Sequence, residues 1–369
     1  FRYVPCEETD SVEVSVTDGG TFDDGTEVTI TATPNEGYQF IGWEESASVS
    51  ETLIITLDSN KTYQALFELI PQISLKDRLI EIGYNLPKEN PNLTIIEGDI
   101  RDAKKIGISC KGHDAFVSLA CISNDASFEL DEHLSTSVNL DAFEPMVIAA
   151  KEAGIKRFIY ASSCSVYGYT VDELYDESSP TTCAYPYGIS KLQGESGVMQ
   201  LSDENFSVIS LRQGTVCGYS DRMRFDLVIN TMFKNSMTQG EVIVSNPSIW
   251  RPIYHIQDAC TAFIRAIQAP DSISGIFNVA SDNYTLGQIG DIMSVEMSIN
   301  TNREIKLKLN NIQDFRNYKV SIQHAKLTLG FTPAYGIKDI INDLFLNVQK
   351  FDNYEDDKYY NIKVFKNLG

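Results

Sequence analysis

The chain has 369 residues, 43% of them hydrophobic, and a formal net charge of −21. This charge argues against a nucleic-acid or anionic-membrane partner, because phosphate groups would be repelled. No run of about 18 apolar residues occurs, so no transmembrane helix or membrane insertion is expected. No signal-peptide pattern follows Phe1, which favours a cytoplasmic protein.

The cysteines and histidines predict no metal site. The histidines lie far apart, and the cysteines are scattered, odd in number and without a C-x-x-C pair. Such cysteines are typical of free thiols in a reducing compartment. The seven cysteines are Cys6, Cys110, Cys121, Cys164, Cys183, Cys217 and Cys260.

Residues 1–70 predict a small all-β module. Val28, Ile30 and Ala32 alternate with polar residues, as expected of a strand with one buried face. Turn-forming clusters of Asp, Gly, Pro and Asn separate five such strands. The module holds 14 Asp and Glu against Arg2 and Lys61. We interpret this excess as a solvated acidic surface, since no loop has the carboxylate spacing of a calcium site.

Residues 11–68 resemble the divergent internalin-B-type repeat of bacterial surface proteins. The resemblance is carried by Gly37-Tyr38, Phe40, Gly42-Trp43 and the Ala-x-Phe segment at 65–67. It implies an extracellular stalk or adhesion module, and therefore a cell-surface location as the alternative to the cytoplasm. We expect a spacer without a ligand of its own, with Trp43 in the core.

From about residue 72 the pattern changes to alternating strands and helices, which predicts an α/β fold with a doubly wound, Rossmann-like parallel sheet. This domain is expected over 71–350, with its substrate lobe mainly at 219–256 and 285–350, followed by an unassigned tail at 351–369. The expected strands are 93–96, 115–119, 157–160, 208–211, 242–244 and 275–279, and the expected helices are 136–153, 186–201, 224–238, 257–268, 286–296 and 337–350.

The motif with the clearest chemistry is Tyr187 followed four residues later by Lys191. On a helix these side chains share one face, and the ammonium is expected to lower the pKa of the phenol from about 10 toward working pH. Ser163 lies 24 residues before Tyr187 and offers a hydroxyl to the oxygen that gains or loses the proton. These groups suit hydride transfer at a sugar alcohol.

With several motifs in the family's order along the chain, residues 72–350 resemble the extended short-chain dehydrogenase/reductase family, in its NAD-dependent nucleotide-sugar epimerase/dehydratase branch. The matching segments are EGDIRD at 97–102, SLAC at 118–121, the Ser163, Tyr187 and Lys191 set, LRQGTVCG at 211–218 and RPIYHIQD at 251–258. The resemblance implies a homodimer that uses NAD and a nucleotide sugar.

The resemblance also assigns roles to single residues. Ser163, Tyr187 and Lys191 match its catalytic triad. The implied cofactor-binding residues are Asp99, Ile100, Leu119, Ala120, Cys121, Ser162, Tyr187, Lys191 and Gly214. The implied substrate-binding residues are Ser163, Thr215 and Arg251, with Arg224 and Arg316 as further candidates for the diphosphate, which guanidinium groups bind bidentately.

The two residues that follow the catalytic serine narrow the choice of reaction type. The dehydratases of the resembling branch carry an Asp-Glu pair there for eliminating water, whereas this chain has Cys164 and Ser165. Neither residue replaces a carboxylic acid, so dehydration is disfavoured. Epimerisation by transient oxidation, or a simple oxidation or reduction, needs only Ser163, Tyr187, Lys191 and NAD. Epimerase and reductase, and the identities of sugar and nucleotide, stay open.

The glycine-rich loop of a dinucleotide fold occurs nowhere in the sequence. Residues 72–77 alternate like a short strand, and Asp77 is a candidate ribose ligand that would favour NAD over NADP; a helix over 75–82 is the rival interpretation. On the first interpretation, the repeat module replaces the first strand and first helix. A gene fusion, an assembly join or a pseudoenzyme would explain this, so a non-catalytic or truncated fusion protein acting as a surface or interaction module is the alternative function.

Overall fold

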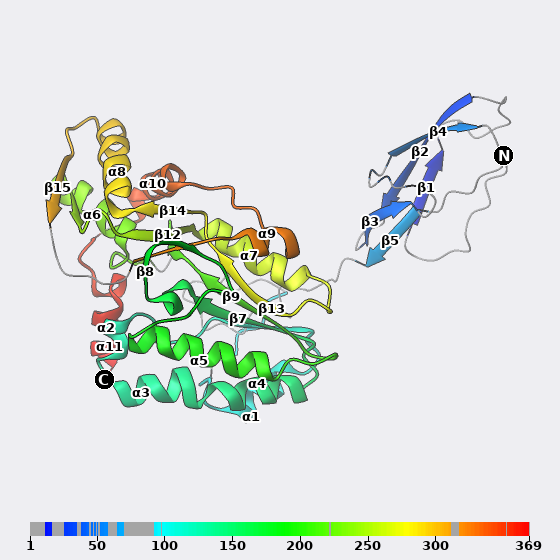
Figure 1. The fold of residues 1–369 in the computed structure, drawn as a ribbon, viewed down its shortest axis with the longest axis horizontal. Coiled ribbons are helices and arrows are strands. Elements are labelled where there is room, and N and C mark those ends of the chain that lie inside the picture. The colour runs from blue at the N-terminus through cyan, green and yellow to red at the C-terminus, as the bar shows by residue number, and fades with distance from the viewer. Residues whose placement is uncertain are drawn as a thin grey trace. The chain divides into compact units, whose positions relative to one another are not determined.

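The structure is a computed structural model that describes residues 12–16, 26–34, 38–43, 46, 48, 50, 52–57, 65–69, 92–96, 98–220, 223–310, 317–351 and 353–368. The chain divides into two compact units, Phe1–Ser74 and Leu75–Gly369 (Figure 1). The exact limits of the module, the substrate lobe and the tail stay predictions.

The first unit is built from antiparallel strands. One sheet has the order β1-β2-β4, and β3 pairs with β5. Val28, Ile30 and Ala32 are buried together with Trp43, which confirms the predicted alternation and the core position of Trp43. The strands are β1 (Val12–Val16), β2 (Thr26–Pro34), β3 (Tyr38–Trp43), β4 (Thr52–Leu57) and β5 (Ala65–Leu69).

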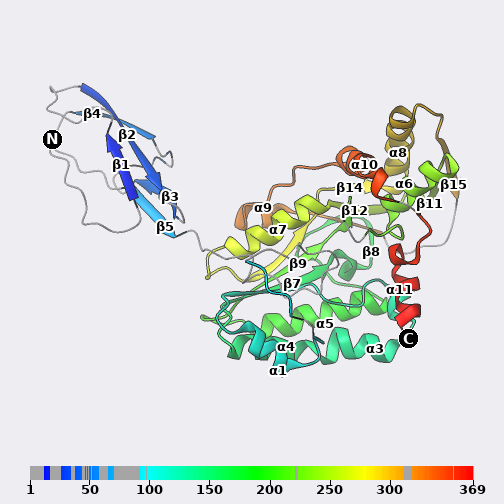
Figure 2. The same cartoon turned by 180° about the vertical axis from the view of Figure 1, so that it is seen from behind.

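The second unit is centred on a parallel sheet with the strand order β13-β9-β7-β6. Helices cover both faces, as Figures 1 and 2 show, so the predicted doubly wound α/β fold is confirmed. The strands are β6 (Ala115–Ser118), β7 (Arg157–Ser163), β9 (Ser207–Gln213) and β13 (Gly275–Val279).

Each face of the sheet has its own apolar core. On one face Val147 and Val198 pack with Phe158 of β7. On the other face Ala262 and Ala325 pack with strand residues such as Ile209. The first face carries α1 (Ala103–Cys110), α4 (Phe143–Glu152) and α5 (Pro186–Gln200), and the second carries α7 (Ile256–Gln268) and α9 (Gln323–Thr328).

The predicted strand at 93–96 is wrong. These residues form no regular element, and Ile95 and Ile96 are 52% and 39% exposed. An apolar run becomes a buried strand only when a neighbour pairs with it, and no strand in the described part of the chain pairs with this one. Among the described strands, β6 pairs only with β7. A doubly wound sheet places its first strand at the other edge of β6.

A second lobe gathers around α6 (Val228–Gln239), α8 (Leu286–Thr301) and α10 (Ile337–Leu346). Helix α6 begins four residues later than predicted, because Arg224 and Asp226 bond to each other in the turn before it. Helix α10 also ends earlier than expected. The lobe strands are β10 (Thr215–Cys217), β11 (Glu241–Ser245), β12 (Trp250–His255), β14 (Asp282–Thr285) and β15 (Lys306–Asn310).

The tail, which the sequence left unassigned, forms two helical elements and joins the lobe core through Phe351 and Tyr359. These elements are the 3-10 helix η5 (Asp357–Tyr359) and α11 (Asn361–Leu368). The remaining elements are α2 (Asp125–Phe128), α3 (Glu132–Thr136), the π-helical turn η2 (Ser137–Asp141), the 3-10 helices η3 (Cys164–Tyr167) and η4 (Val348–Lys350), and the paired strands β8 (Tyr169–Tyr175) and β16 (Asn317–Val320).

Candidate active site

Lys191 is buried and held against the central sheet. It is 4% exposed, and its Nζ donates a hydrogen bond of 2.7 Å to the carbonyl oxygen of Ala161 on β7. The same Nζ lies 5.8 Å from the ring centroid of Tyr187. The four-residue spacing on α5 therefore places the ammonium beside the phenol, two residues from the end of the strand that carries Ser163.

The start of α5 is fixed by a residue that the motif does not contain. Pro186 occupies the first turn, where its missing N–H costs nothing. The N–H of Tyr187 donates to the carboxylate of Asp125, at 3.1 Å. Asp125 lies 62 residues earlier in the chain, on α2, so no local pattern could have indicated this contact. This hydrogen bond fixes the position of the first turn of α5, which carries Tyr187.

Two glycines let α5 approach the sheet closely. A Cβ on Gly188 would lie 3.2 Å from the carbonyl oxygen of Ser165 and would collide with the sulfur of Cys183. A Cβ on Gly194 would lie 2.5 Å from the hydroxyl of Tyr160. The helix is thus packed directly against β7 and the turn that follows it, which keeps Tyr187 near the end of that strand.

Ser163 ends β7 and caps the 3-10 helix η3. Its Oγ accepts a hydrogen bond of 3.2 Å from the N–H of Ser165 and one of 2.9 Å from the hydroxyl of the same residue. With both acceptor positions used, the hydroxyl hydrogen of Ser163 is left to donate. The sequence motif assigns no role to Ser165, although its spacing of two residues from Ser163 is the signal that could have predicted this contact.

The protonation of Tyr187 differs from the expectation drawn from its spacing to Lys191. Burial raises the pKa of Tyr187 above its usual value, and the opposing effect of the Lys191 ammonium is smaller. Burial lowers the pKa of Lys191, but the neighbouring acidic groups of Cys121 and Tyr187 outweigh this, so the lysine pKa is raised. The site therefore holds a neutral phenol beside an ammonium, and further positive charge is needed to form tyrosinate.

Five of the predicted cofactor residues lie at or just after the carboxyl ends of β6, β7 and β9, where doubly wound folds bind dinucleotides: Leu119, Ala120, Cys121, Ser162 and Gly214. Leu119 and Ala120 are exposed immediately after β6. The Oγ of Ser162 is buried and has no hydrogen-bond partner among the described residues. A Cβ on Gly214 would lie 2.8 Å from the carbonyl oxygen of Pro252, so this position is crowded.

Asp99 is placed apart from these groups and is half-exposed. Its carboxylate is bonded by Arg101, whose hydrogen bonds hold the pKa of Asp99 below its usual value. Ile100 is partly buried and packs beside the core under α1 and α4. Asp77 and Arg316 lie outside the described residues, so their assigned roles stay predictions.

Of the predicted substrate residues, Arg224 is the one whose charge acts on the pKa of Tyr187. Its positive charge lowers the pKa of Tyr187, although burial and Lys191 have larger effects. The guanidinium bonds both carboxylate oxygens of Asp226, at 2.9 and 3.0 Å, and its Nη1 lies 3.4 Å from Ser123 Oγ. Its charge is therefore compensated by Asp226, and its assignment to the diphosphate stays a prediction.

Arg251 and Thr215 lie on neighbouring strands of the lobe sheet, β12 and β10. Arg251 is 8% exposed, and its Nη1 donates to the carbonyl oxygen of Trp250, at 2.9 Å. Its guanidinium carbon lies 5.4 Å from the ring centroid of Tyr318. Thr215 is partly buried at the start of β10.

A buried ion pair connects α5 to β9, one turn beyond Lys191. Glu195, one turn after Lys191, bonds Arg212 of β9 at 2.6 Å, and both side chains are buried. Arg212 also donates to the hydroxyl of Tyr167, at 2.8 Å. Such a pair is costly to break, because each partner would leave a buried charge. Sequence reasoning did not identify it.

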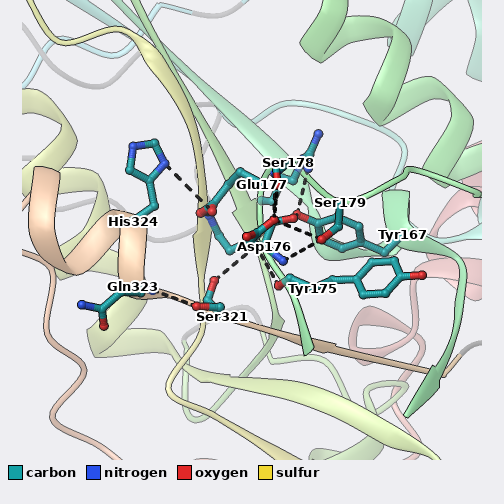
Figure 3. A network of polar contacts seen from close by, with 11 residues as sticks. Tyr167, Tyr175, Asp176, Glu177, Ser178, Ser179, Ser321, Gln323 and His324 are labelled. Carbon is teal, nitrogen blue, oxygen red and sulfur yellow. Dashed lines mark hydrogen bonds and ion pairs between the residues drawn. The ribbon is translucent and has the colours of Figure 1, made fainter. Parts of the chain in front are cut away.

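The support continues from Tyr167 to a surface turn (Figure 3). The hydroxyl of Tyr167 lies 3.0 Å from the carbonyl oxygen of Asp176, whose carboxylate accepts hydrogen bonds from Ser178 and Ser179. Glu177 accepts from the backbone N–H of Asn278 on β13, at 2.6 Å. These contacts connect η3, which follows the Ser163 end of β7, to the surface turn and to β13 of the same sheet.

Residues 36–280 match the model of the NAD dependent epimerase/dehydratase family. The chain belongs to this family. The sequence-based prediction of an NAD-dependent enzyme of this family is confirmed. The match begins within the first compact unit, which ends at Ser74.

Among curated relatives, the uncharacterized UDP-glucose epimerase YtcB of Bacillus subtilis (strain 168) is 25% identical over 72% of this chain and 81% of its own length. The dTDP-D-glucose 4,6-dehydratase of Mus musculus is 34% identical, but over only 34% of this chain and 37% of its own length. The similarity to the first relative therefore extends over most of this chain, and that to the second over only about a third of it.

Solved structures confirm the fold. MoeE5 in complex with UDP-glucose and NAD is similar with a TM-score of 0.61 and 22% identity, covering 70% of this chain and 86% of that one. UDP-glucuronic acid 4-epimerase from Bacillus cereus, in complex with UDP-glucuronic acid and NAD, has a TM-score of 0.61 and 19% identity, covering 71% and 83%. In the described part of this chain, no helix is long and apolar enough to cross a membrane.

Proposed function

We propose that the protein is an NAD-dependent nucleotide-sugar epimerase or a closely related oxidoreductase, with Tyr187 as its acid/base. The observation that carries this proposal is the Lys191 ammonium, fixed between the Ala161 carbonyl and the ring of Tyr187 at the end of β7. The family, and the UDP-sugars named in the relatives' titles, support the choice of substrate class.

Three residues of the chain take part in the transfer of one proton. Tyr187 takes the proton of the sugar hydroxyl and later returns it, while Lys191 stabilises the phenolate. Ser163, with its acceptor positions used by Ser165, donates its hydroxyl hydrogen to the reacting sugar oxygen. When bound, NAD would accept the hydride, and the positive charge of its oxidised ring would lower the pKa of the phenol further. An epimerase would return the hydride to the other face of the keto-sugar, after that sugar had turned in the site.

Dehydration is disfavoured by the residues beside Ser163. Cys164 is fully buried, its sulfur donates to the carbonyl oxygen of Arg212 at 3.1 Å, and burial raises its pKa above the usual value. Ser165 is engaged with Ser163. Neither side chain offers the two extra proton carriers that elimination of water requires, despite the partial likeness to dehydratases.

We propose that NAD lies across the carboxyl ends of β6, β7 and β9. Support comes from the unpartnered hydroxyl of Ser162 and the exposed Leu119 and Ala120. Asp99 and Asp77 would contact the adenosine part, and Gly214 would border the nicotinamide. Cys121, beside Lys191, would face the cofactor with its backbone.

A label-transfer experiment tests the proposed reaction. UDP-glucose carrying deuterium at carbon 4 of the sugar is incubated with the protein and NAD, and the products are followed by NMR. An epimerase returns the deuterium to the same carbon of UDP-galactose, whereas a dehydrogenase acting at that carbon transfers it to NAD, so that deuterated NADH accumulates. Absence of both products over a panel of UDP- and dTDP-sugars would contradict the proposal.

The alternative is a non-catalytic surface or interaction protein. This alternative is favoured because the glycine-rich loop of dinucleotide folds does not occur in the sequence. On that proposal residues 11–68 are an internalin-type repeat at the cell surface. Recovery of the chain outside the cell, together with no NAD binding at millimolar concentration, would support it.

For the enzyme we propose a homodimer in the cytoplasm. The six described cysteines are free thiols, as a reducing compartment favours. Light scattering that gives a monomer mass would contradict the dimer, and fractionation of cells that recovers the chain only outside the cytoplasm would contradict the location.

A further inference from the structure

The candidate catalytic residues come from two separate segments of the chain. Ser163 ends β7 and caps η3, whereas Tyr187 and Lys191 lie on α5. Proton transfer at one sugar oxygen needs all three side chains in a fixed arrangement, so the position of η3 relative to α5 matters for the reaction. A direct hydrogen bond between the two segments runs from Lys191 Nζ to the carbonyl oxygen of Ala161, two residues before Ser163.

A second connection reaches the chain on the other side of Ser163, at Tyr167. Tyr167 is the last residue of η3, four residues after Ser163, and is fully buried. Its hydroxyl accepts a hydrogen bond of 2.8 Å from Nη1 of Arg212, and Nη2 of the same guanidinium donates to Glu195 at 2.6 Å. Glu195 lies one turn after Lys191 on α5. The same helix is therefore bonded to the chain both before and after Ser163.

The hydroxyl of Tyr167 is shared by several buried groups. It lies 2.8 Å from Oδ1 of Asn278 and 3.0 Å from the carbonyl oxygen of Asp176, the two acceptors available for its single hydrogen (Figure 3). Burial raises the pKa of Tyr167, so the phenol keeps this hydrogen. Asn278 and Arg212 are 0% and 4% exposed. Loss of the hydroxyl would take a partner from each of them, and a buried polar group without a partner favours a shift of the surrounding chain.

The hydrogen bonds of η3 link Tyr167 to the hydroxyl of Ser163. The N–H of Gly168, the residue after Tyr167, donates to the carbonyl oxygen of Ser165 at 3.1 Å. Ser165 donates in turn to Ser163 Oγ, through its N–H at 3.2 Å and its hydroxyl at 2.9 Å. A shift at the end of η3 therefore moves the two donors that orient the Ser163 hydroxyl.

We propose that Tyr167 is a positioning residue of the candidate catalytic set. Its hydroxyl, held by Arg212 on the carboxylate of Glu195, fixes η3 and so keeps the Ser163 hydroxyl oriented toward the sugar oxygen that exchanges its proton with Tyr187. This inference rests on the proposed function, in which Ser163 donates to that oxygen. Because Tyr167 acts through Ser163, its loss should lower kcat and leave KM nearly unchanged.

Steady-state kinetics of the full chain test the inference, with NAD and the sugar nucleotide of the UDP and dTDP panel that is converted fastest. In Tyr167→Phe we expect kcat to fall about tenfold, as for a small misplacement of a proton-transfer group, and KM to stay within about twofold. In the Ser163→Ala background the same substitution should change kcat by less than about twofold. Tyr175→Phe is the matched control and should leave kcat unchanged, because its ring packs edge-on against Tyr167 while no hydrogen bond among the described residues uses its hydroxyl.

Arg212→Lys tests the same connection from the other side of the bond. A lysine ammonium can keep the ion pair with Glu195 but lacks the second arm that reaches Tyr167, so we expect the same fall in kcat and the same dependence on Ser163. This variant decides the test if Tyr167→Phe does not fold. A kcat within about twofold of the unaltered chain, or an equal loss with and without the Ser163 hydroxyl, would overturn the inference.

Hydrogen exchange separates this inference from the proposed reaction. The amide hydrogens of Gly168 and Cys183 both bond to carbonyl oxygens of η3, and in Tyr167→Phe they should exchange at least about tenfold faster than in Tyr175→Phe. If the unaltered chain converts no sugar nucleotide, the proposed reaction fails, and faster exchange at these amides still supports the hold of Tyr167 on η3. Unchanged exchange at both amides overturns the inference, whether or not turnover is seen.

Discussion

Two parts of the α/β domain, the carboxyl end of β7 and the segment around Asp99, are held in place very differently. At β7, the candidate catalytic residues are anchored by buried contacts: Lys191 to the Ala161 carbonyl, and Glu195 to Arg212. Beyond β6, Asp99 is held by an exposed ion pair with Arg101. The proposed proton-transfer groups are thus held in place by the core, whereas Asp99, the proposed adenosine ligand, is fixed only by a neighbouring residue.

The difference follows from strand neighbours. β7 lies between β6 and β9, so helices can pack on both of its faces and bury polar groups in satisfied networks. β6 has a single partner among the described strands, and residues 94–96 are exposed. Substitutions at the β7 end should therefore cost activity or stability, while those beyond β6 should affect little besides cofactor affinity.

The largest effect is expected from Tyr187→Phe, which removes the proton carrier and keeps the ring. Turnover of the sugar nucleotide should fall about 10²- to 10⁴-fold, the usual contribution of a general acid/base. NAD affinity, followed by quenching of tryptophan fluorescence, should stay within about twofold of the unaltered chain. Turnover within tenfold of the unaltered enzyme would assign the proton to another group.

Lys191→Met tests how the pKa of Tyr187 is set. The ammonium lowers this pKa against the effect of burial, so its removal should raise it further. Because oxidation needs the phenolate, the rate of that step should rise with pH, and the rising limb should move to higher pH in the variant. At neutral pH we expect a loss of about 10²-fold. An unchanged limb in the pH profile would show that the lysine does not act on the phenol.

Glu195→Ala should be the most destabilising change near the site. It leaves the Arg212 guanidinium buried without its carboxylate, a defect that costs about 3–5 kcal/mol. Chemical denaturation gives the difference directly. The double variant Glu195→Leu with Arg212→Met removes both charges and should recover much of the loss; a double variant as unstable as the single one would point to packing instead.

Gly194→Ala and Gly197→Ala form a matched pair on α5. The new Cβ at 194 would collide with the Tyr160 hydroxyl, so we expect a loss of about 1–3 kcal/mol from overpacking. At 197 nothing lies within 4 Å, and the substitution should stabilise the helix by about 0.5–1 kcal/mol. Equal changes in unfolding free energy would mean that α5 does not lie tightly on β7.

What could be predicted from the sequence was local or periodic. The spacing of Tyr187 and Lys191 placed them on one helical face, and buried runs gave β6, β7, β9 and β13. Contacts between distant segments could not be predicted: Asp125 with Tyr187, and Asn361 with Ser123, are joined by the fold alone. The strand expected at 93–96 failed for the same reason, because burial needs a partner strand that an apolar run does not specify.

The smallest effect on stability is expected beyond β6. Asp99→Ala breaks an ion pair whose side chains are 48% and 45% exposed, so the unfolding midpoint should not change measurably. If Asp99 contacts the adenine amino group, as the family resemblance implies, NAD affinity should still fall by about tenfold. Arg101→Ala breaks the same pair but keeps the carboxylate, so it should leave NAD affinity nearly unchanged. Two variants with equal NAD affinity would mean that the carboxylate serves only the ion pair, and the cofactor would then be held almost entirely from the β7 side.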